Sequence, residues 1–260
     1  MMQRVATAIV LLPLVLLSIL YLPSSLFLLI TDLILGLGVF ELLRLLARYG
    51  VKAYWFTFPL ALFLPWVWTY SPESVLNYLV VSSLICMGHS VFQAREMKTG
   101  FLSMSGNLMA ILYLSVPLSI AGSFQRSQVP HLLMVLSVVW AGDTFAYWVG
   151  KRWGKHKVTS QVSPHKSLEG YLAGLLFSVL AAMVCGHYFF PDWPTAYLVL
   201  IGAFLGLVGT VGDLFESMLK RGADIKDSSN LLPGHGGVLD RIDSLLFALP
   251  AYYTLLVLIK

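Results

Sequence analysis

Long apolar runs separated by short polar turns dominate this chain. A helix needs about 20 residues to cross a hydrocarbon core roughly 30 Å thick. Nine apolar runs approach that length and are candidates for such helices. They lie near residues 5–22, 25–46, 53–70, 75–93, 106–124, 131–150, 168–190, 195–217 and 242–259. The pattern therefore predicts an all-α, polytopic transmembrane helical bundle with about nine spans.

Two of the nine runs have unusual features. The run 53–70 contains Pro59 and Pro65, but proline is tolerated in membrane helices, so we expect a kinked span there. The run 5–22 follows an N-terminal arginine and resembles a signal peptide. No small-x-small cleavage site follows it, so we expect a retained first span.

The composition agrees with a membrane protein. Hydrophobic residues make up 58% of the chain and charged residues 12%, whereas soluble domains carry about 25% charged residues. No polar stretch is long enough to fold into a soluble domain. We expect one integral membrane unit, with N-terminal helices one to five in 1–130 and a catalytic part in 131–260 that holds spans six to nine and two cytoplasmic loops.

The basic residues indicate the orientation of the spans. With the N-terminus inside, all of the 17 Lys and Arg residues except Arg126 and Lys260 lie on the inner side. This asymmetry obeys the positive-inside rule. It also explains the net charge of +4 without a nucleic-acid partner, because anionic lipids attract cations at that face. The two long inner loops, 151–167 and 218–241, are the candidates for function.

Charges inside the spans are the informative residues, because each is costly in lipid. Asp213, Glu216 and Lys220 are spaced to share one helix face, which fits either ion pairs at the membrane boundary or a functional cluster. Asp32 and Glu41 lie in the second run without an assigned role. Glu41 is three residues from Arg44, so we expect an ion pair between them.

Asp240 and Asp243 follow the glycines of His235-Gly236-Gly237 at the start of the last run. Two carboxylates at a helix start fit simple capping. They equally fit a site for Mg²⁺ and phosphate, because glycines and a helix N-terminus favour anions and hard cations take oxygen ligands. The spacing leaves both readings open.

Glycines recur at helical spacing in the seventh and eighth runs. Gly170 and Gly174 open the seventh, and the eighth carries Gly202, Gly206 and Gly209. Small residues at such intervals let membrane helices approach closely. We expect these glycines to hold the seventh and eighth spans together.

Several motifs in 140–247 resemble one family. The stretch Ser217-Met218-Leu219-Lys220-Arg221 is followed by Lys226-Asp227 and by His235-Gly236-Gly237-x-x-Asp240-Arg241-x-Asp243. This series closely resembles the signature of the phosphatidate cytidylyltransferases. Three further stretches also look like that family, namely Gly142-Asp143-Thr144, Val162-Ser163-Pro164-His165-Lys166-Ser167 and Gly212-Asp213-Leu214. His165 stands where many members have glycine.

The resemblance implies a reaction in which CTP and phosphatidate give CDP-diacylglycerol and pyrophosphate. It implies a bacterial inner-membrane homodimer with the active site facing the cytoplasm among membrane lipids. It implies Mg²⁺ as cofactor and leaves open a monovalent cation such as K⁺. The metal ligands would be Asp213, Asp240 and Asp243. The catalytic residues implied are Asp213, Lys220, Arg221, Lys226, Asp227, His235, Asp240 and Arg241, and the substrate-binding residues are Asp143, Ser163, Lys166, Ser217, Gly236 and Gly237.

Other functions fit parts of the pattern. A CTP-dependent lipid or polyprenol kinase is the nearest alternative. An ion-coupled membrane transporter would explain the intramembrane carboxylates, but not two long basic loops on one side, and no internal repeat is evident. A CDP-alcohol phosphotransferase is disfavoured, because its D-G-x-x-A-R pattern is absent.

Overall fold

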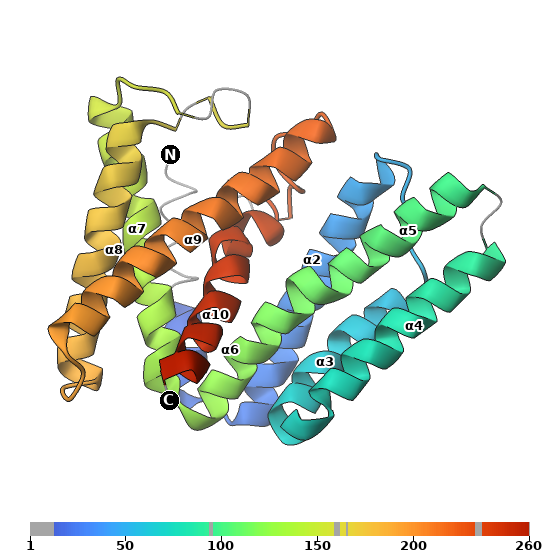
Figure 1. Ribbon diagram of the computed structural model, residues 1–260, viewed down its shortest axis with the longest axis horizontal. Helices are drawn as coiled ribbons and strands as arrows, with labels where there is room; N and C mark the ends of the chain where they lie inside the picture. The colour runs from blue at the N-terminus through green and yellow to red at the C-terminus, as the bar shows by residue number, and fades with distance from the viewer. Residues whose placement is uncertain (1–12, 94–95, 159–161, 165, 232–235, 260) are drawn as a thin grey trace. The chain divides into compact units, whose positions relative to one another are not determined.

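The computed structural model describes residues 13–93, 96–158, 162–164, 166–231 and 236–259. Helices make up most of these residues, and the described part contains one isolated antiparallel bridge, between Lys157 and Ser167. The expected all-α fold is confirmed. Figure 1 shows the helices α2 (Ser24–Ala47), α3 (Thr57–Tyr70), α4 (Val75–Gln93), α5 (Met97–Ala110), α6 (Val116–Ser127), α7 (Val129–Trp153), α8 (Leu168–Phe189), α9 (Thr195–Gly222) and α10 (Leu239–Ile259), with short η1 (Pro72–Ser74) and η2 (Ile111–Ser115) segments.

Seven helical stretches in the described part are long and apolar enough to cross a membrane. One is the continuous stretch Met97–Arg126, which starts well before the predicted 106–124. The predicted span 53–70 corresponds to α3, whose 14 residues reach only about 21 Å and which is not among the seven. The predicted span 5–22 falls outside the described residues at 5–12, and its residues 13–21 are helical.

Two helix ends near the expected site differ from the sequence prediction. Helix α9 continues to Gly222 rather than stopping near 217, and α10 begins at Leu239 rather than near 242. The last turn of α9 carries Lys220 and Arg221, and the first turn of α10 carries Asp240. Charges of these signs complement the helix dipole at the two ends, which favours the longer helices.

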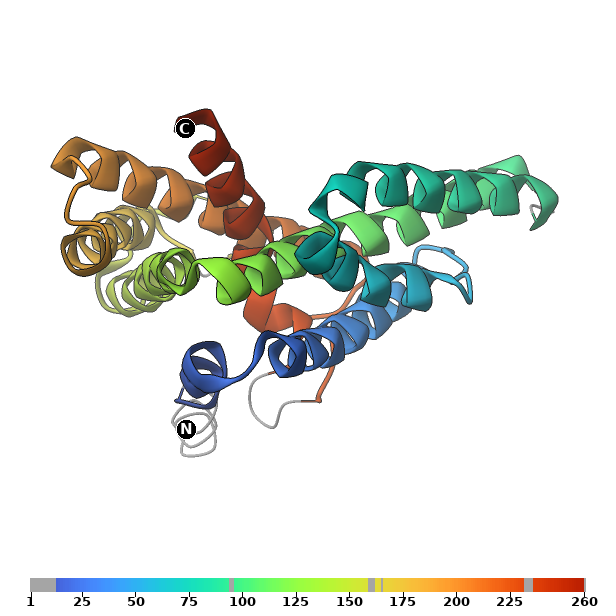
Figure 2. The same cartoon turned by 90° about the horizontal axis from the view of Figure 1, so that it is seen from below.

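The chain forms two compact units. The first contains 1–127 and 223–241, so the segment after α9 belongs to the same unit as the N-terminal helices. Within it α2 packs on α3 and α6, and α4 lies along α5, as Figure 2 shows. Buried leucines on α2, including Leu35 and Leu42, form part of its core.

The second unit contains 128–222 and 242–260. Helix α8 packs along both α7 and α9 (Figure 1). A β-carbon at Gly202 of α9 would lie 2.6 Å from the Cα atom of Val179 on α8. A β-carbon at Gly174 of α8 would lie 3.0 Å from the carbonyl oxygen of Gly142 on α7. Only glycine allows such close backbones.

The packing role predicted for the glycines is confirmed, but their partners are more varied than expected. Gly202 and Gly206 of α9 face α8, as predicted. Gly174 instead faces α7, and a β-carbon at Gly212 of α9 would lie 2.7 Å from the carbonyl oxygen of Asp243 on α10. The small residues therefore join four helices, which brings the polar ends of α7, α9 and α10 together.

Candidate functional site

The first polar group lies in the first unit and is built around Glu41 of α2. This side chain is buried, with 1% of the residue exposed. Its Oε1 atom accepts hydrogen bonds from the hydroxyl of Ser229 at 2.6 Å and the amide of Val238 at 3.1 Å. Its Oε2 atom accepts from the hydroxyl of Ser228 at 3.1 Å and the amide of Leu239 at 2.8 Å. Neutral donors therefore surround both carboxylate oxygens.

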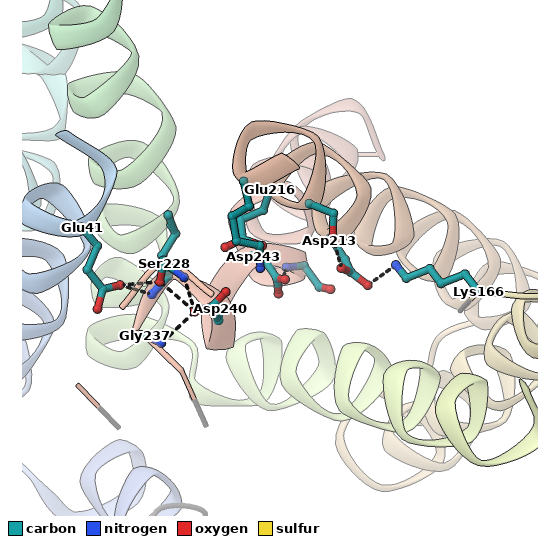
Figure 3. A network of polar contacts seen from close by, with 12 residues as sticks. Glu41, Lys166, Asp213, Glu216, Ser228, Gly237, Asp240 and Asp243 are labelled. Carbon is teal, nitrogen blue, oxygen red and sulfur yellow. Dashed lines mark hydrogen bonds and ion pairs between the residues drawn. The ribbon is translucent and has the colours of Figure 1, made fainter. Parts of the chain in front are cut away.

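Asp240 belongs to the same group. Its Oδ2 atom accepts hydrogen bonds from the amide of Ser228 at 2.9 Å, the hydroxyl of Ser228 at 2.7 Å and the amide of Gly237 at 2.7 Å. The Ser228 hydroxyl thus lies within hydrogen-bond distance of both Glu41 and Asp240 (Figure 3). Its single proton can be donated to only one of them at a time.

The two glycines of the expected signature are required by this geometry. Gly236 has a φ of 78°, a left-handed conformation that glycine adopts without strain. A β-carbon at Gly237 would lie 2.6 Å from Oε1 of Glu41, so no side chain fits there. These glycines shape the backbone around Asp240 and leave the Gly237 amide free to donate to it.

The second polar group lies in the second unit, where Lys166 forms an ion pair with Asp213 of α9. Both side chains are partly exposed, at 23% and 29%. Lys166 comes from the loop before α8, which is held by a hydrogen bond from the amide of Leu168 to the carbonyl of His156. The hydroxyl of Ser217 lies 3.5 Å from Oδ1 of Asp213. The pair is therefore accessible and carries one basic and one acidic predicted site residue.

A second ion pair joins Glu216 and Lys220 one turn apart on α9. The Glu216 side chain is fully buried and that of Lys220 is 11% exposed. The shared face predicted for Asp213, Glu216 and Lys220 is thus divided between two pairs. Of the two alternatives, an ion pair or a functional cluster, Glu216 fits the ion pair, because the burial of both partners indicates a structural contact.

Asp143 of α7 and Asp243 of α10 complete the acidic region of the second unit. Each interacts electrostatically with Asp213, and Asp243 also interacts with Lys220. Asp143 lines a small cleft formed by α7, α8 and α9, whose walls include Gly142, Gly174 and Gly206. Small walls leave the Asp143 carboxylate room for a partner.

The structure places most of the remaining predicted residues at exposed positions. Lys226 and Asp227 are exposed in the segment after α9, and Arg221 and Arg241 are exposed near helix ends. The backbone carbonyl of Ser163 accepts a hydrogen bond from the amide of Lys166 at 3.2 Å. His235 and His165 lie outside the described residues.

Glu41, Ser228 and Ser229 are the site residues that the motifs did not indicate. The ion pair expected between Glu41 and Arg44 is wrong, since none of the ion pairs among described residues joins them. Glu41 binds the distant serines and amides instead. The available signal was its position in a long apolar run, because a carboxylate in a span needs partners that its own helix does not supply.

The acidic region was compared with what Mg²⁺ requires. No group of three or more His, Cys, Asp or Glu side chains in the described part forms a ready-made metal site. Asp143, Asp213 and Asp243 nevertheless offer only oxygen donors, which Mg²⁺ prefers, and they interact electrostatically with one another. A cation would offset their mutual repulsion, so the type of donor suits this metal although the described side chains do not form a preformed site.

Comparison with known proteins identifies the family to which the chain belongs. Residues 2–259 match the sequence model of the cytidylyltransferase family. The chain belongs to this family. A phosphatidate cytidylyltransferase of Staphylococcus aureus strain COL is 34% identical over 195 residues, covering 74% of this chain and 72% of the relative. One of Staphylococcus haemolyticus strain JCSC1435 is 35% identical over 184 residues, covering 70% and 69%.

A third relative in the cytidylyltransferase family is more similar over a shorter stretch. The phosphatidate cytidylyltransferase of Bacillus subtilis strain 168 is 44% identical over 128 residues, 49% of this chain and 48% of that protein. The alignment thus spans about half the length of the Bacillus relative. The family resemblance predicted from the motifs is confirmed.

Proposed function

We propose that this chain transfers the cytidylyl group of CTP to phosphatidate, giving CDP-diacylglycerol and pyrophosphate. Its family membership and the printed names of its relatives support this reaction. The structural observation that carries the proposal is the accessible Lys166–Asp213 pair beside further carboxylates. In such a pair, the lysine can exchange its carboxylate partner for a phosphate, and the aspartate can exchange its ammonium partner for a metal cation.

The chemistry needs charge neutralisation more than proton transfer. A phosphate oxygen of phosphatidate attacks the α-phosphorus of CTP, and the bond from that phosphorus to the bridging oxygen of the β-phosphate breaks. Pyrophosphate carries away the electron pair. Because phosphate monoesters are already ionised near neutral pH, no general base is required. Both reactants are anions, so fixed cations lower the barrier by offsetting their repulsion.

Lys166 is the cation best placed for this role. Its partner Asp213 holds the ammonium group in position before substrate arrives, and both side chains remain partly exposed. An arriving phosphate competes for the ammonium group, because charge-assisted hydrogen bonds to phosphate are strong. Lys220 is less suitable as a direct ligand, since it is engaged with buried Glu216. We assign further phosphate contacts to the exposed Arg221, Lys226 and Arg241.

Mg²⁺ is the proposed cofactor. Asp143, Asp213 and Asp243 would hold it, since they supply oxygen donors with mutual repulsion to relieve. When bound, the metal supplies positive charge to the phosphate oxygens. Asp240 belongs to the first unit, and its role is tested separately by substitution.

The proposed setting is the cytoplasmic face of a bacterial inner membrane. The bias of Lys and Arg to one side, counted with the nine spans predicted from the sequence, supports this orientation. Exposed apolar side chains along α8 and α9, such as Leu176 and Leu200, suit contact with lipid tails. CTP would arrive from the cytoplasm and phosphatidate from the bilayer. We further propose a homodimer, as the family resemblance implies.

The test uses purified full-length protein in detergent with α-labelled CTP, phosphatidate and Mg²⁺. We expect labelled CDP-diacylglycerol and release of pyrophosphate. A phosphorylated lipid labelled only from γ-labelled CTP would instead establish a lipid kinase. No turnover of CTP with phosphatidate or polyprenol, in protein shown to be folded, would exclude both enzymes and leave the transporter.

Asp240→Asn provides a second test, of an acidic site residue that lies in the first unit. The amide preserves the shape of the side chain and removes its charge. We expect turnover to fall by roughly a hundredfold or more, with unchanged expression. Activity close to that of the wild type would remove Asp240 from the proposed site.

A further inference from the structure

We propose that Glu41 is a positioning residue, which holds the segment carrying Asp240 in the geometry that turnover needs. This inference rests on the proposed function. Glu41 comes from α2, in the half of the chain where no motif predicted a site residue. The segment it holds has two arms, residues 226–231 and 236–241, which we call the loop arms.

Glu41 contacts both loop arms at once. The hydroxyls of Ser228 and Ser229 come from the first arm, and the amides of Val238 and Leu239 come from the second. Each carboxylate oxygen lies within hydrogen-bond distance of one hydroxyl and one backbone amide, and the Ser228 hydroxyl is shared with Asp240. A buried carboxylate is costly unless its oxygens are hydrogen-bonded, and the two backbone amides and the Ser229 hydroxyl donate to Glu41 throughout. Glu41 therefore links the two loop arms, and we call this set of contacts from Glu41 to Ser228, Ser229, Val238 and Leu239 the clasp.

The clasp is directly connected to Asp240. The hydroxyl and the amide of Ser228 both lie within hydrogen-bond distance of Oδ2 of Asp240. The amides that bind Glu41 also belong to the two residues immediately before Asp240 in the chain. A shift of the clasp therefore displaces the aspartate itself. Misplacing a reactive group by about 1 Å costs on the order of a hundredfold in rate.

The hydrogen-bond pattern requires a carboxylate rather than an amide. Both Glu41 oxygens face a backbone N–H, which can only donate. In Glu41→Gln, the new NH₂ group faces one of these N–H groups whichever way the amide turns. Two donors then oppose each other, and the backbone must shift. The hydroxyls of Ser228 and Ser229 can rotate to accept, but the amides of the second arm cannot.

The same unit contains a buried polar contact that serves as a matched control. Thr57 donates from its hydroxyl to Oδ1 of Asn107 at 2.6 Å, and both residues are fully buried. This bond holds the connection before α3 and has no contact with the loop arms. Thr57→Val removes one buried hydrogen bond while keeping the side-chain shape. It measures how much general destabilisation alone lowers turnover.

The experiment compares purified full-length wild type, Glu41→Gln, Glu41→Asp and Thr57→Val in detergent. We measure kcat and KM for CTP, thermal unfolding, and hydrogen exchange of the Val238 and Leu239 amides by mass spectrometry. For Glu41→Gln we expect kcat about a hundredfold lower and faster exchange at those amides. For Glu41→Asp, which keeps the charge, we expect kcat between the two. For Thr57→Val we expect kcat within about threefold of wild type despite a lower unfolding temperature.

The inference is overturned if wild type turns over CTP and Glu41→Gln keeps kcat within about threefold. It is also overturned if kcat falls equally in Glu41→Gln and Thr57→Val, because the role would then be general stability. If Glu41→Gln does not fold, Glu41→Asp decides: the inference then requires a kcat below that of Thr57→Val and faster exchange at the Val238 and Leu239 amides, and it is overturned if either is missing. If wild type itself does not turn over CTP, the proposed function fails, while unchanged exchange in Glu41→Gln would separately refute the clasp.

Discussion

The two groups of carboxylates in this molecule have different kinds of partners. In the first unit, neutral hydroxyls and backbone amides surround Glu41 and bind Oδ2 of Asp240. In the second unit, Asp213 and Glu216 are paired with lysine ammonium groups. Backbone donors are fixed by the fold, whereas a long lysine side chain can change partner. The first group is suited to holding geometry and the second to exchanging ligands.

The second group is itself divided by burial. The Lys166–Asp213 pair is partly exposed and can open for a phosphate or a cation. The Glu216–Lys220 pair is buried, so opening it would leave an uncompensated charge. Two ion pairs on one helix therefore serve different purposes. Substitutions in each class of contact test this division.

The largest effect is expected from Asp213→Asn. Loss of this charge removes the partner of Lys166 and one proposed metal ligand, so turnover of CTP should fall about a thousandfold. The measurement is kcat with phosphatidate in detergent. Asp192→Asn, at an exposed position in the turn between α8 and α9, is the control and should keep its activity. Equal activity in both variants would contradict the proposed role of the accessible pair.

Lys220→Met should show the next largest effect, and it should appear in stability. Buried Glu216 would lose its partner, at a cost of about 3 kcal/mol in the free energy of unfolding. Unfolding in mixed detergent micelles measures this. Adding Glu216→Gln should restore most of the loss, because no buried charge then remains unpaired. A single variant as stable as wild type would show that the pair is not structural.

Lys166→Met should lower turnover about 30-fold, because a hydrogen bond to a charged group contributes about 2 kcal/mol. The free energy of unfolding should change little, since the pair is partly exposed. Lys98→Met, an exposed lysine outside the site, is the control. If Lys166→Met destabilised the protein as strongly as Lys220→Met, the distinction between the two pairs would be lost.

The smallest effect is expected from Ser229→Ala. This change removes one of the four bonds to Glu41 and should cost about 1 kcal/mol of stability. Turnover should fall by less than in Glu41→Gln, because both backbone amides keep their acceptor. Ser105→Ala, which removes only a bond to the carbonyl one turn earlier on α5, is the matched control. A larger loss of turnover than in Glu41→Gln would contradict the assignment of the clasp to Glu41.

Helix prediction worked where the signal was local. A predicted run overlaps each of the seven long apolar helices in the described part, because a bilayer-spanning helix must be apolar along its whole length. The prediction failed at 53–70, where the apolar run includes a loop before the short helix α3. The bounds of α9 and α10 were also missed. Charged residues ended the apolar signal there before the helix itself ended or began.

The sequence by itself determined the helical class, the family and most of the candidate residues. These properties depend on residue type and on spacing within one segment. The family signature within 140–247 can therefore be identified without knowing how the helices pack. Lys166 and Asp213 were both identified this way, although neither motif predicted that they pair.

Only the tertiary structure decided which carboxylate meets which donor. Glu41 lies 187 residues from Ser228 and 198 from Leu239 in the chain, so no local pattern records their contact. The difference in burial between the Glu216 and Asp213 side chains likewise depends on how neighbouring helices pack against α9. A buried carboxylate must be hydrogen-bonded, and the packing of the helices decides which donors lie close enough to bind it.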